Sequence, residues 1–343
     1  MRISSRGYVR AVSSAVLFGL IGLAAADVEA AEMKKVTLSH AGATTLRLPF
    51  YVAYDKGYFK QENLDLEIVE TQSGSDAMKM LAGGSVNFST GQLLDAVNLS
   101  KQGINIVGVA MLTSRLTNSV VIRKSLAGQV KTMKDLEGRT VGVTSVGSGT
   151  WQFAGFVGRL QGADTEKFNY IGVGTGANVI GAIKSGRVDA MSYSDPENFK
   201  LVQDGDAEFL VDMGDDAVHK KFVGETYLNN QVMVLADYAK RNPDTVQGFV
   251  NALQKALDWM NKSSPEEITR SLMGFPGFQK ADYNLLLISV RRQLPVRQTA
   301  QITKDAFDNA MKFPMTIGLL KEAVPMPVVV DNTFSDKAAK RGN

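Results

Sequence analysis

A regular alternation of short apolar strands with amphipathic helices sets the fold class of this chain. The first third of the sequence predicts four strands with helices between them. Parallel strands need long crossovers, which helices usually provide, so the alternation predicts an open, mostly parallel sheet flanked by helices. The predicted strands are Lys35–His40, Asp65–Val69, Ser85–Ser89 and Ile104–Ala110, and the predicted helices are Pro49–Lys56, Asp76–Leu81 and Gln92–Gln102.

The pattern then starts again. Ser119–Arg123 is a lone strand, a second series of strands and helices follows, and Gln231–Leu235 is another lone strand before a helical C-terminal part. We therefore predict an α/β protein of two lobes, with residues 33–116 plus 238–343 in lobe 1 and residues 117–237 in lobe 2. A single continuous Rossmann-like sheet is the alternative. The second series comprises strands Arg139–Val143, Phe168–Val173, Val188–Tyr193 and Glu208–Val211, with helices Trp151–Leu160, Asn178–Lys184 and Pro196–Val202.

The loops after the predicted strands are rich in Gly, Ser and Thr. In open α/β sheets, ligands bind beyond the carboxyl ends of the strands, where helix N-termini offer N–H groups. Three such loops from each lobe predict a cleft for a small polar ligand. Alternatively they are ordinary turns and caps, with Ser75 capping one helix and Thr90 or Gly91 the next. The expected ligand-binding residues are Thr44, Thr45, Leu46, Ser75, Thr90, Gly91, Ser148, Gly149, Thr150, Trp151, Thr175, Asn178, Tyr193 and Asp195.

Charged and aromatic residues near these loops have two interpretations each. Arg47 and Arg115 are either partners for a carboxylate or sulfonate or ordinary surface arginines. Trp151 is either a wall of the ligand site or part of the core. His40 either faces the cleft or is a structural residue. His219, close to an acidic turn and two lysines, is expected to be solvated.

Composition excludes several functional classes. The chain has no cysteine, which excludes disulfides, thiolate metal sites and cysteine nucleophiles, and its two histidines make a histidine metal cage improbable. A net charge of +3 without a basic block argues against nucleic-acid binding. No cofactor or metal is therefore expected. The one hint of an enzyme is Gly172–Ala177 (GVGTGA), which fits a dinucleotide-binding loop, with Asp195 near the end of the next strand.

The N-terminus has the layout of a Sec signal peptide. Arg2, Arg6 and Arg10 precede an uncharged apolar run, Ala11–Ala26, and small residues lead to a cleavage site after Ala30. The alternative is a membrane anchor, but the run is shorter than the roughly 20 residues of a spanning helix. Since no cysteine follows it, we expect a soluble periplasmic protein, with residues 1–30 removed, rather than a lipoprotein.

Several segments together resemble the nitrate/sulfonate/taurine solute-binding proteins of ABC importers. Leu48–Phe59 (LPFYVAYDKGYF) followed by Glu62–Leu66 (ENLDL) is similar to the opening motif of that family, with Asn63 where a Gly is common. The resemblance spans nearly the whole chain after residue 30. It continues through Gly74–Ala77, Leu81–Asn87 (LAGGSVN), Val130–Ser145 (VKTMKDLEGRTVGVTS), Gly181–Ala190 (GAIKSGRVDA) and Asn242–Pro243.

The resemblance implies a type II periplasmic binding fold, with the ligand between two hinged lobes. It also implies a protein without catalysis that docks on a membrane permease and its ATPase. Related fungal thiamine-pyrimidine synthases use this fold with a Cys-rich motif, which this chain lacks. We expect a monomer that binds a small organic anion or polar metabolite of the sulfonate, carboxylate or pyrimidine type. The alternatives are the dinucleotide-dependent enzyme and a sensory solute-binding protein.

Overall fold

The computed structural model describes residues 32–294 and 299–341. The predicted signal peptide, residues 1–30, lies outside the described residues. Ten strands within the described part form two sheets of five strands each. Among these residues, no helix combines the length and the apolar character needed to cross a bilayer.

The first sheet has the strand order β2-β1-β3-β10-β4. β1 is parallel to β2 and β3, whereas β10 is antiparallel to its neighbours β3 and β4. All strands of this sheet except β10 therefore point the same way. The strands are β1 (Lys34–Ala41), β2 (Leu64–Thr71), β3 (Phe88–Gly91), β4 (Ile106–Thr113) and β10 (Asn230–Leu235).

The second sheet repeats this plan with the order β7-β6-β8-β5-β9. β6 is parallel to β7 and β8, and β5 is antiparallel to both β8 and β9. Each sheet thus contains one reversed strand, and these are the two lone strands of the sequence. The strands are β5 (Ser119–Arg123), β6 (Thr140–Val143), β7 (Asn169–Gly172), β8 (Ala190–Tyr193) and β9 (Ala207–Val211).

Helices cover both sheets. The helices before β5 are α1 (Leu48–Asp55), α2 (Tyr58–Gln61), α3 (Gly74–Ala82) and α4 (Leu93–Lys101). Those between β6 and β10 are α5 (Gly149–Leu160), α6 (Ala177–Lys184), α7 (Glu197–Gln203) and α8 (Asp216–Val223). The C-terminal ones are α9 (Ala236–Arg241), α10 (Pro243–Met260), α11 (Pro265–Met273), α12 (Tyr283–Gln293), α13 (Lys304–Thr316), α14 (Met326–Val329) and α15 (Thr333–Arg341).

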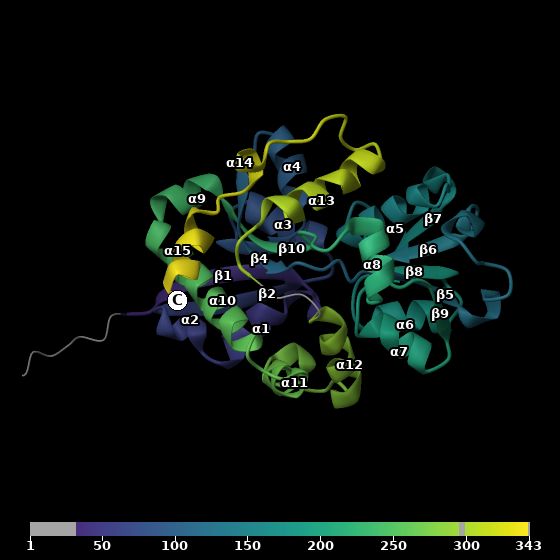
Figure 1. Cartoon of the computed structure of the whole chain (residues 1–343), viewed down its shortest axis with the longest axis horizontal. Coiled ribbons are helices and arrows are strands. Elements are labelled where there is room, and N and C mark those ends of the chain that lie inside the picture. Colours follow the sequence, from purple (N-terminus) through teal and green to yellow (C-terminus); the bar gives the residue numbers. More distant parts are fainter. Residues whose placement is uncertain (1–31, 295–298, 342–343) are drawn as a thin grey trace, which may run out of the picture. The chain divides into compact units, whose positions relative to one another are not determined.

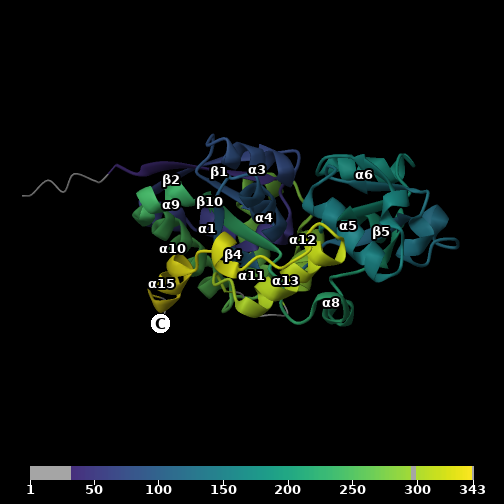
Figure 2. The same ribbon diagram turned by 90° about the horizontal axis from the view of Figure 1, so that it is seen from above.

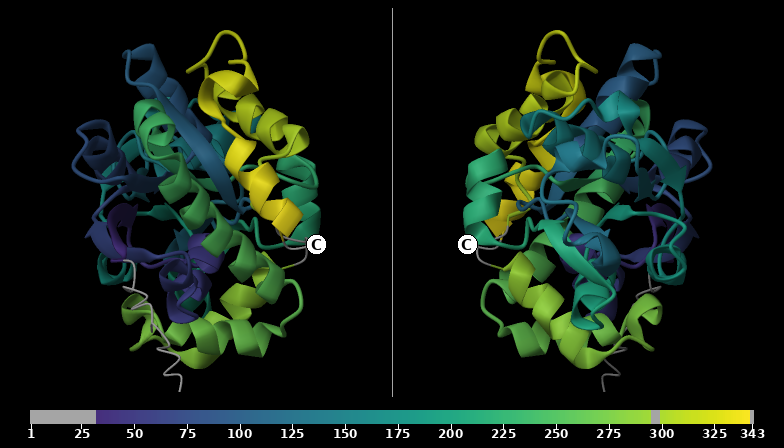
Figure 3. Two further views of the ribbon diagram at one scale, coloured as in Figure 1. Left: turned by 90° about the vertical axis from the view of Figure 1, so that its left-hand side faces the viewer. Right: turned by 90° about the vertical axis from the view of Figure 1, so that its right-hand side faces the viewer.

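The first sheet is buried on both faces. Along β10, Met233 packs into the apolar cluster that includes α3 and α4, whereas Val232 and Val234 pack into the cluster of α1 and α10. This alternation follows from the two-residue period of a strand. Figure 1 shows the sheet between these two helix pairs, and Figure 3 shows α15 (yellow) beside α10 (green). These findings confirm the predicted α/β fold with two sheets.

The C-terminal part of the chain contacts both sheets' helices. Phe313 of α13 stacks on Phe156 of α5, with ring centroids 4.3 Å apart, and Figure 2 shows the two helices side by side. β10, which the predicted boundary at residue 237 put in lobe 2, is hydrogen-bonded into the first sheet. The sequence concealed this because β10 directly follows segments of the second sheet. We propose that the chain returns to lobe 1 just before Asn230.

Three local expectations are corrected by the structure. Ser73, not Ser75, caps α3, because its Oγ accepts the N–H of Asp76 at 3.2 Å. Gln92, not Thr90 or Gly91, precedes α4, because β3 continues to Gly91. The structure also has α8, which the sequence analysis left as a solvated turn.

Asn63 explains a departure from the family motif. Its φ of 56° lies in the left-handed region, where glycine is favoured and asparagine is among the best substitutes. The turn into β2 therefore keeps its conformation although the usual glycine is absent.

Candidate ligand-binding cleft

A small cavity of about 60 Å³ lies between the loops of the two sheets. Residues at or just after the ends of β1, β3, β6, β7 and β8 form most of its wall, as expected for the ligand site of open α/β sheets. The lining residues before β5 are Ala41, Thr44, Leu46, Arg47, Gly74, Thr90, Gly91, Gln92, Asp95 and Asn118. Those after β5 are Thr144, Ser148, Gly149, Thr150, Thr175, Tyr193, Ser194 and Asn230.

Three hydroxyl groups at the start of α5 form a hydrogen-bonded cluster in this wall. Thr144 Oγ1 lies 2.8 Å from Ser148 Oγ and 3.1 Å from Thr150 Oγ1, and the latter two oxygens are 2.9 Å apart. Ser148 is the N-cap of α5. The first turn of α5, which carries the positive end of the helix dipole, is therefore part of the cavity wall.

Arg47 is buried in the wall at 5% exposure. Its Nε donates to Thr90 Oγ1 at 2.9 Å, and its Nη1 donates to the carbonyl oxygen of Gly42 at 3.0 Å and to Thr44 Oγ1 at 3.1 Å. All of these partners are neutral, and no carboxylate of the described residues pairs with this guanidinium. Since buried charges are normally paired, Arg47 gives the cavity a positive group that suits an anion.

The two sheets approach each other closely at the cleft. A Cβ atom at Gly149 would lie 2.3 Å from Nε2 of Gln92, and one at Gly42 would lie 2.9 Å from Cβ of Thr175. Only glycine fits at such distances without a shift of the neighbour. Gly42 also has a φ of 27°, which side chains rarely adopt. The loops of the two sheets are therefore in contact at two places beside the cavity.

The structure brings most of the predicted ligand-binding residues together. The ones that line the cavity are Thr44, Leu46, Thr90, Gly91, Ser148, Gly149, Thr150, Thr175 and Tyr193. The others, Thr45, Ser75, Trp151, Asn178 and Asp195, lie outside its lining. Trp151 instead borders a separate pocket with Tyr170, at a ring distance of 5.9 Å. Ser75 lies in the first turn of α3, and Asn178 is exposed on α6.

Asp195 and Thr45 are buried in a contact between α12 and the second sheet. Nε of Arg292 donates to Oδ2 of Asp195 at 2.7 Å, and the same guanidinium also pairs with Asp212. The N–H and hydroxyl of Thr45 donate to the carbonyl oxygen of Asp195 at 3.4 and 3.3 Å. Burial raises the pKa of Asp195, and the charge of Arg292 opposes this rise. Arg292 has no signal in the sequence, because it lies far from any predicted strand end.

Three other lining residues were missed because they lie outside the loops that follow the predicted strands. Asn118 lies in the segment that leads into the second sheet, and Asn230 begins β10, which the sequence analysis placed in lobe 2. Asp95 is on α4, one turn beyond the loop that was examined. Reading one further turn of each helix and both crossing segments would have found all three.

Neither histidine belongs to the cavity lining. His40 is fully buried, its Nδ1 is 3.2 Å from the carbonyl oxygen of Ala41, and burial lowers its pKa to about 3. This favours the structural interpretation. The expectation that His219 is solvated is wrong, because α8 buries it and its Nε2 accepts the N–H of Leu116 at 3.1 Å. Burial lowers the pKa of His219 to about 4.

Arg115 also has a structural role. It is 1% exposed and forms an ion pair with Asp216 of α8 at 2.5 Å, away from the cavity lining. No group of residues able to hold a metal ion is found within 32–294 and 299–341.

The loop that resembles a dinucleotide fingerprint is engaged by the other sheet. Thr175 of this loop faces Gly42, and a Cβ at Gly174 would lie 3.1 Å from Oε1 of Gln72. β7, which precedes the loop, is an edge strand. The close contacts leave this loop as one wall of the shared cleft.

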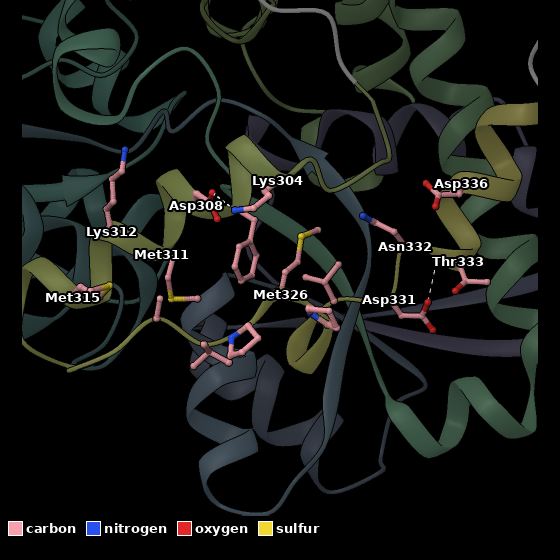
Figure 4. A pocket seen from close by; sticks show the side chains of 16 residues that line it. Lys304, Asp308, Met311, Lys312, Met315, Met326, Asp331, Asn332, Thr333 and Asp336 are labelled. Carbon is pink, nitrogen blue, oxygen red and sulfur yellow. Dashed lines mark hydrogen bonds and ion pairs between the residues drawn. The ribbon is translucent and has the colours of Figure 1, made fainter.

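A larger groove of about 850 Å³ lies elsewhere, between α13 and the α14–α15 segment. Its lining includes Met311, Met315 and Met326, and the Lys304–Asp308 ion pair lies at its edge (Figure 4). None of the predicted ligand-binding residues lines it, and it does not receive the strand ends of either sheet. The cleft is therefore the candidate site.

The chain is similar to curated proteins of two kinds. The chain is 24% identical over 238 residues to the 4-amino-5-hydroxymethyl-2-methylpyrimidine phosphate synthase THI12 of Saccharomyces cerevisiae, covering 63% of this chain and only 64% of the synthase. It is 26% identical over 282 residues to the formylaminopyrimidine-binding protein of Halalkalibacterium halodurans, covering 78% of this chain and 80% of that protein.

The fold matches a solved solute-binding protein. The alkanesulfonate-binding protein SsuA from Xanthomonas axonopodis pv. citri superposes with a TM-score of 0.71 at 17% identity, covering 89% of this chain and all of that chain. This match confirms the two-lobe periplasmic binding fold, and the formylaminopyrimidine-binding relative agrees with the resemblance to solute-binding proteins. The family model described as NMT1/THI5 like matches residues 45–268. The chain therefore belongs to the NMT1/THI5-like family.

Proposed function

We propose that this chain is the solute-binding component of an ABC importer. It binds a small organic anion or polar metabolite in the periplasm and delivers it to a membrane permease with its ATPase. The observation that carries the proposal is Arg47, a buried cation in the wall of the cleft whose hydrogen-bond partners are all neutral. An anionic group on the ligand completes this site.

Binding is coupled to closure of the two lobes. Ligand contacts to Arg47 on one side and to the hydroxyl cluster of Thr144, Ser148 and Thr150 on the other exist together only when the loops meet. A ligand shifts such an equilibrium by its differential affinity for the closed state. The segments around Asn118 and Asn230 connect the sheets and act as the hinge.

The named relatives support a ligand of the sulfonate, carboxylate or pyrimidine type. One relative is named for binding a formylaminopyrimidine, and a structural neighbour is named for binding alkanesulfonates. Other relatives are named as synthases. For this chain we propose binding without catalysis, because the cavity lining contains neither histidine nor cysteine.

A thermal-shift panel on the purified protein tests the proposal. The panel contains sulfonates, nitrate, aromatic acids, aminopyrimidines and polyamines, each at millimolar concentration. A ligand raises the melting midpoint by mass action, and titration calorimetry then gives Kd. Arg47→Gln should abolish the shift, whereas Arg123→Gln, which alters a paired arginine outside the cavity, should preserve it. No shift with any class of compound, or an unchanged shift in Arg47→Gln, would refute the proposal.

Two further experiments address the partner and the cellular location. Cell fractionation with an antibody against this chain should recover it in the periplasmic fraction. Deletion of its gene should abolish uptake of the radiolabelled ligand found in the panel. A chain that chemically converts the ligand during prolonged incubation, as detected by mass spectrometry, would instead be an enzyme.

A further inference from the structure

The cleft contains a carboxylate as well as the guanidinium. Asp95 of α4 lines the cavity, and its Oδ2 accepts the backbone N–H of Gln92 at 2.8 Å. Its Oδ1 makes no hydrogen bond to any described residue. Asp95 forms no ion pair within the described ranges. It and Arg47 therefore do not pair with each other, although both groups border one small cavity.

Two buried amide oxygens add to the acceptors of the cleft. Oδ1 of Asn118 and Oδ1 of Asn230 are buried and have no hydrogen-bond partner, with the whole residues 1% and 4% exposed. Both residues line the same cavity as Asp95. Buried polar atoms are almost always hydrogen-bonded in native proteins, so these oxygens call for a donor.

The hydroxyl cluster of α5 and two nitrogens of Arg47 do not supply that donor. The hydroxyls of Thr144, Ser148 and Thr150 bond one another, and the Nε and Nη1 of Arg47 already donate to protein atoms. A simple anion such as a sulfate-like or carboxylate group carries acceptors only. It satisfies Arg47 but leaves the oxygens of Asp95, Asn118 and Asn230 without partners.

Resting on the proposed function, we infer that the ligand is dipolar: it carries a nitrogen with N–H donors for Asp95 and an acidic or strong acceptor group for Arg47. The donor is either an aliphatic ammonium, as in a short aminoalkyl acid, or the amino group of a heterocycle. A carboxylate in a small cavity favours ligands that carry such a donor, because a ligand without one leaves it unpaired.

Asp95 is the specificity-determining residue in this arrangement. Burial raises the pKa of its carboxyl to about 6, so it is mostly ionised at neutral pH and available to a cation. Gly91 keeps space for it, since a Cβ there would lie 2.9 Å from Oδ2 of Asp95.

A matched ligand series on the unmodified protein provides the first test. 2-Aminoethanesulfonate, 2-hydroxyethanesulfonate and ethanesulfonate differ only at the position of the nitrogen. A second pair, 4-aminopyrimidine-5-carboxylate and pyrimidine-5-carboxylate, represents the heterocyclic donor. We expect the amino compound of one set to bind at least tenfold more tightly than its analogue without the amino group in calorimetry at pH 7.5. The set with this preference identifies the source of the donor.

Two variants give the second test. Asp95→Asn keeps a cap for the N–H of Gln92 but removes the charge, and it should weaken the preferred amino compound at least tenfold while leaving ethanesulfonate equal or tighter. Asp135→Asn is the matched control, because Asp135 accepts the N–H of Thr132 in another capping box outside the cavity. It should leave both affinities unchanged.

The outcomes separate this inference from the proposed function. If the acids without the amino group bind as tightly as their amino analogues, the dipolar ligand is refuted while the solute-binding proposal stands. If Asp95→Asn weakens all acids equally, the role of Asp95 is refuted. If no compound in either set or in the larger panel binds, both proposals fall together.

Discussion

Arg292 and Asp195 form a buried ion pair that ties α12 to the second sheet, with Nε of the arginine 2.7 Å from Oδ2 of the aspartate. Asp212 accepts from the same guanidinium, and the rings of Phe199 and Phe209 lie 5.5 and 5.2 Å from its central carbon. Asp195 is 1% exposed. A charge pair this enclosed favours the state in which the two parts are in contact.

Replacing this arginine should open the ligand-free protein. Breaking a buried pair by removing one partner costs about 3–5 kcal/mol, and separation of the lobes lets water solvate Asp195. We expect Arg292→Met to increase the radius of gyration in small-angle X-ray scattering. Arg291→Met is the control, because Arg291 pairs with Glu266 on the exposed surface. Equal radii for both variants would contradict this prediction.

A methyl group at Gly42 should act as a wedge between the lobes. Its Cβ would meet that of Thr175 at 2.9 Å, and overpacking of this kind costs typically about 1–3 kcal/mol. We therefore expect Gly42→Ala to weaken ligand binding about tenfold or more, measured by calorimetry. Thr175→Gly in the same chain should restore much of the affinity.

The control for the wedge is Gly84→Ala. Gly84 also has a positive φ, of 72°, but nothing lies within 4 Å of a Cβ there. Both variants therefore carry a backbone penalty, and only Gly42→Ala adds the contact with Thr175. Equal affinities for the two variants would show that the loops do not need to meet for binding.

Affinity for an ammonium-bearing ligand should fall in acid. The pKa of Asp95 is raised to about 6 by burial, so at pH 5 only about a tenth of this carboxyl is ionised and Kd should rise about tenfold relative to pH 7.5. Titrations of 2-aminoethanesulfonate between pH 5 and 7.5 measure this change. Ethanesulfonate should show the opposite trend or none.

Other ionisable groups do not produce the same profile between pH 5 and 7. Burial lowers the pKa of His40 to about 3 and that of His219 to about 4. Burial raises the pKa of Glu197, near Asp195, to about 8, so this group stays largely protonated over that range. The loss of affinity at low pH should therefore disappear in Asp95→Asn. If the loss persists in this variant, another ionisable group causes it.

The stability of the fold should depend on the proton state of His219. Its pKa falls from 6.5 to about 4 on folding, so the unfolded chain binds more protons between these values. The favourable contribution is complete above pH 6.5 and is lost as the pH falls toward 4. We expect His219→Gln, which keeps an acceptor for the N–H of Leu116, to flatten the decline.

Urea unfolding at several pH values measures this effect. One titrating group changes the slope of unfolding free energy by at most about 1.4 kcal/mol per pH unit. The difference between the variant and the original chain cancels the contributions of other groups. If His219→Gln has the same slope of unfolding free energy against pH as the original chain between pH 6 and 5, protonation of His219 does not destabilise the folded state.

Most of the fold follows from periodicity in the sequence. Each predicted strand has a counterpart, because apolar runs bounded by Gly, Asn and Asp are strong local signals. The sequence does not show which strands pair. Nothing in Gln231–Leu235 indicates that this strand pairs with β3 and β4, which lie far earlier in the chain. α8 was missed because Asp215 and Asp216 suggest a turn, whereas Asp215 is the N-cap of a helix.

The site was predictable to the extent that it follows the ends of strands. Thr90, Ser148, Thr150 and Thr175 were found by that rule alone. Arg47 remained ambiguous, since only the structure reveals that its guanidinium is buried among neutral partners. Asp195 was expected in the cavity because it follows β8, and Arg292, ninety-seven residues later, draws its side chain elsewhere.

The position of β10 has a consequence for biosynthesis. β4 is joined to the rest of its sheet only through β10, which comes after all five strands of the other sheet. Until Leu235 has left the ribosome, β3 and β4 each have an edge whose backbone N–H and C=O groups lack their β10 partners. A nascent chain that ends before β10 can complete the second sheet but not the first. Premature termination should therefore yield aggregation-prone fragments rather than a folded N-terminal lobe.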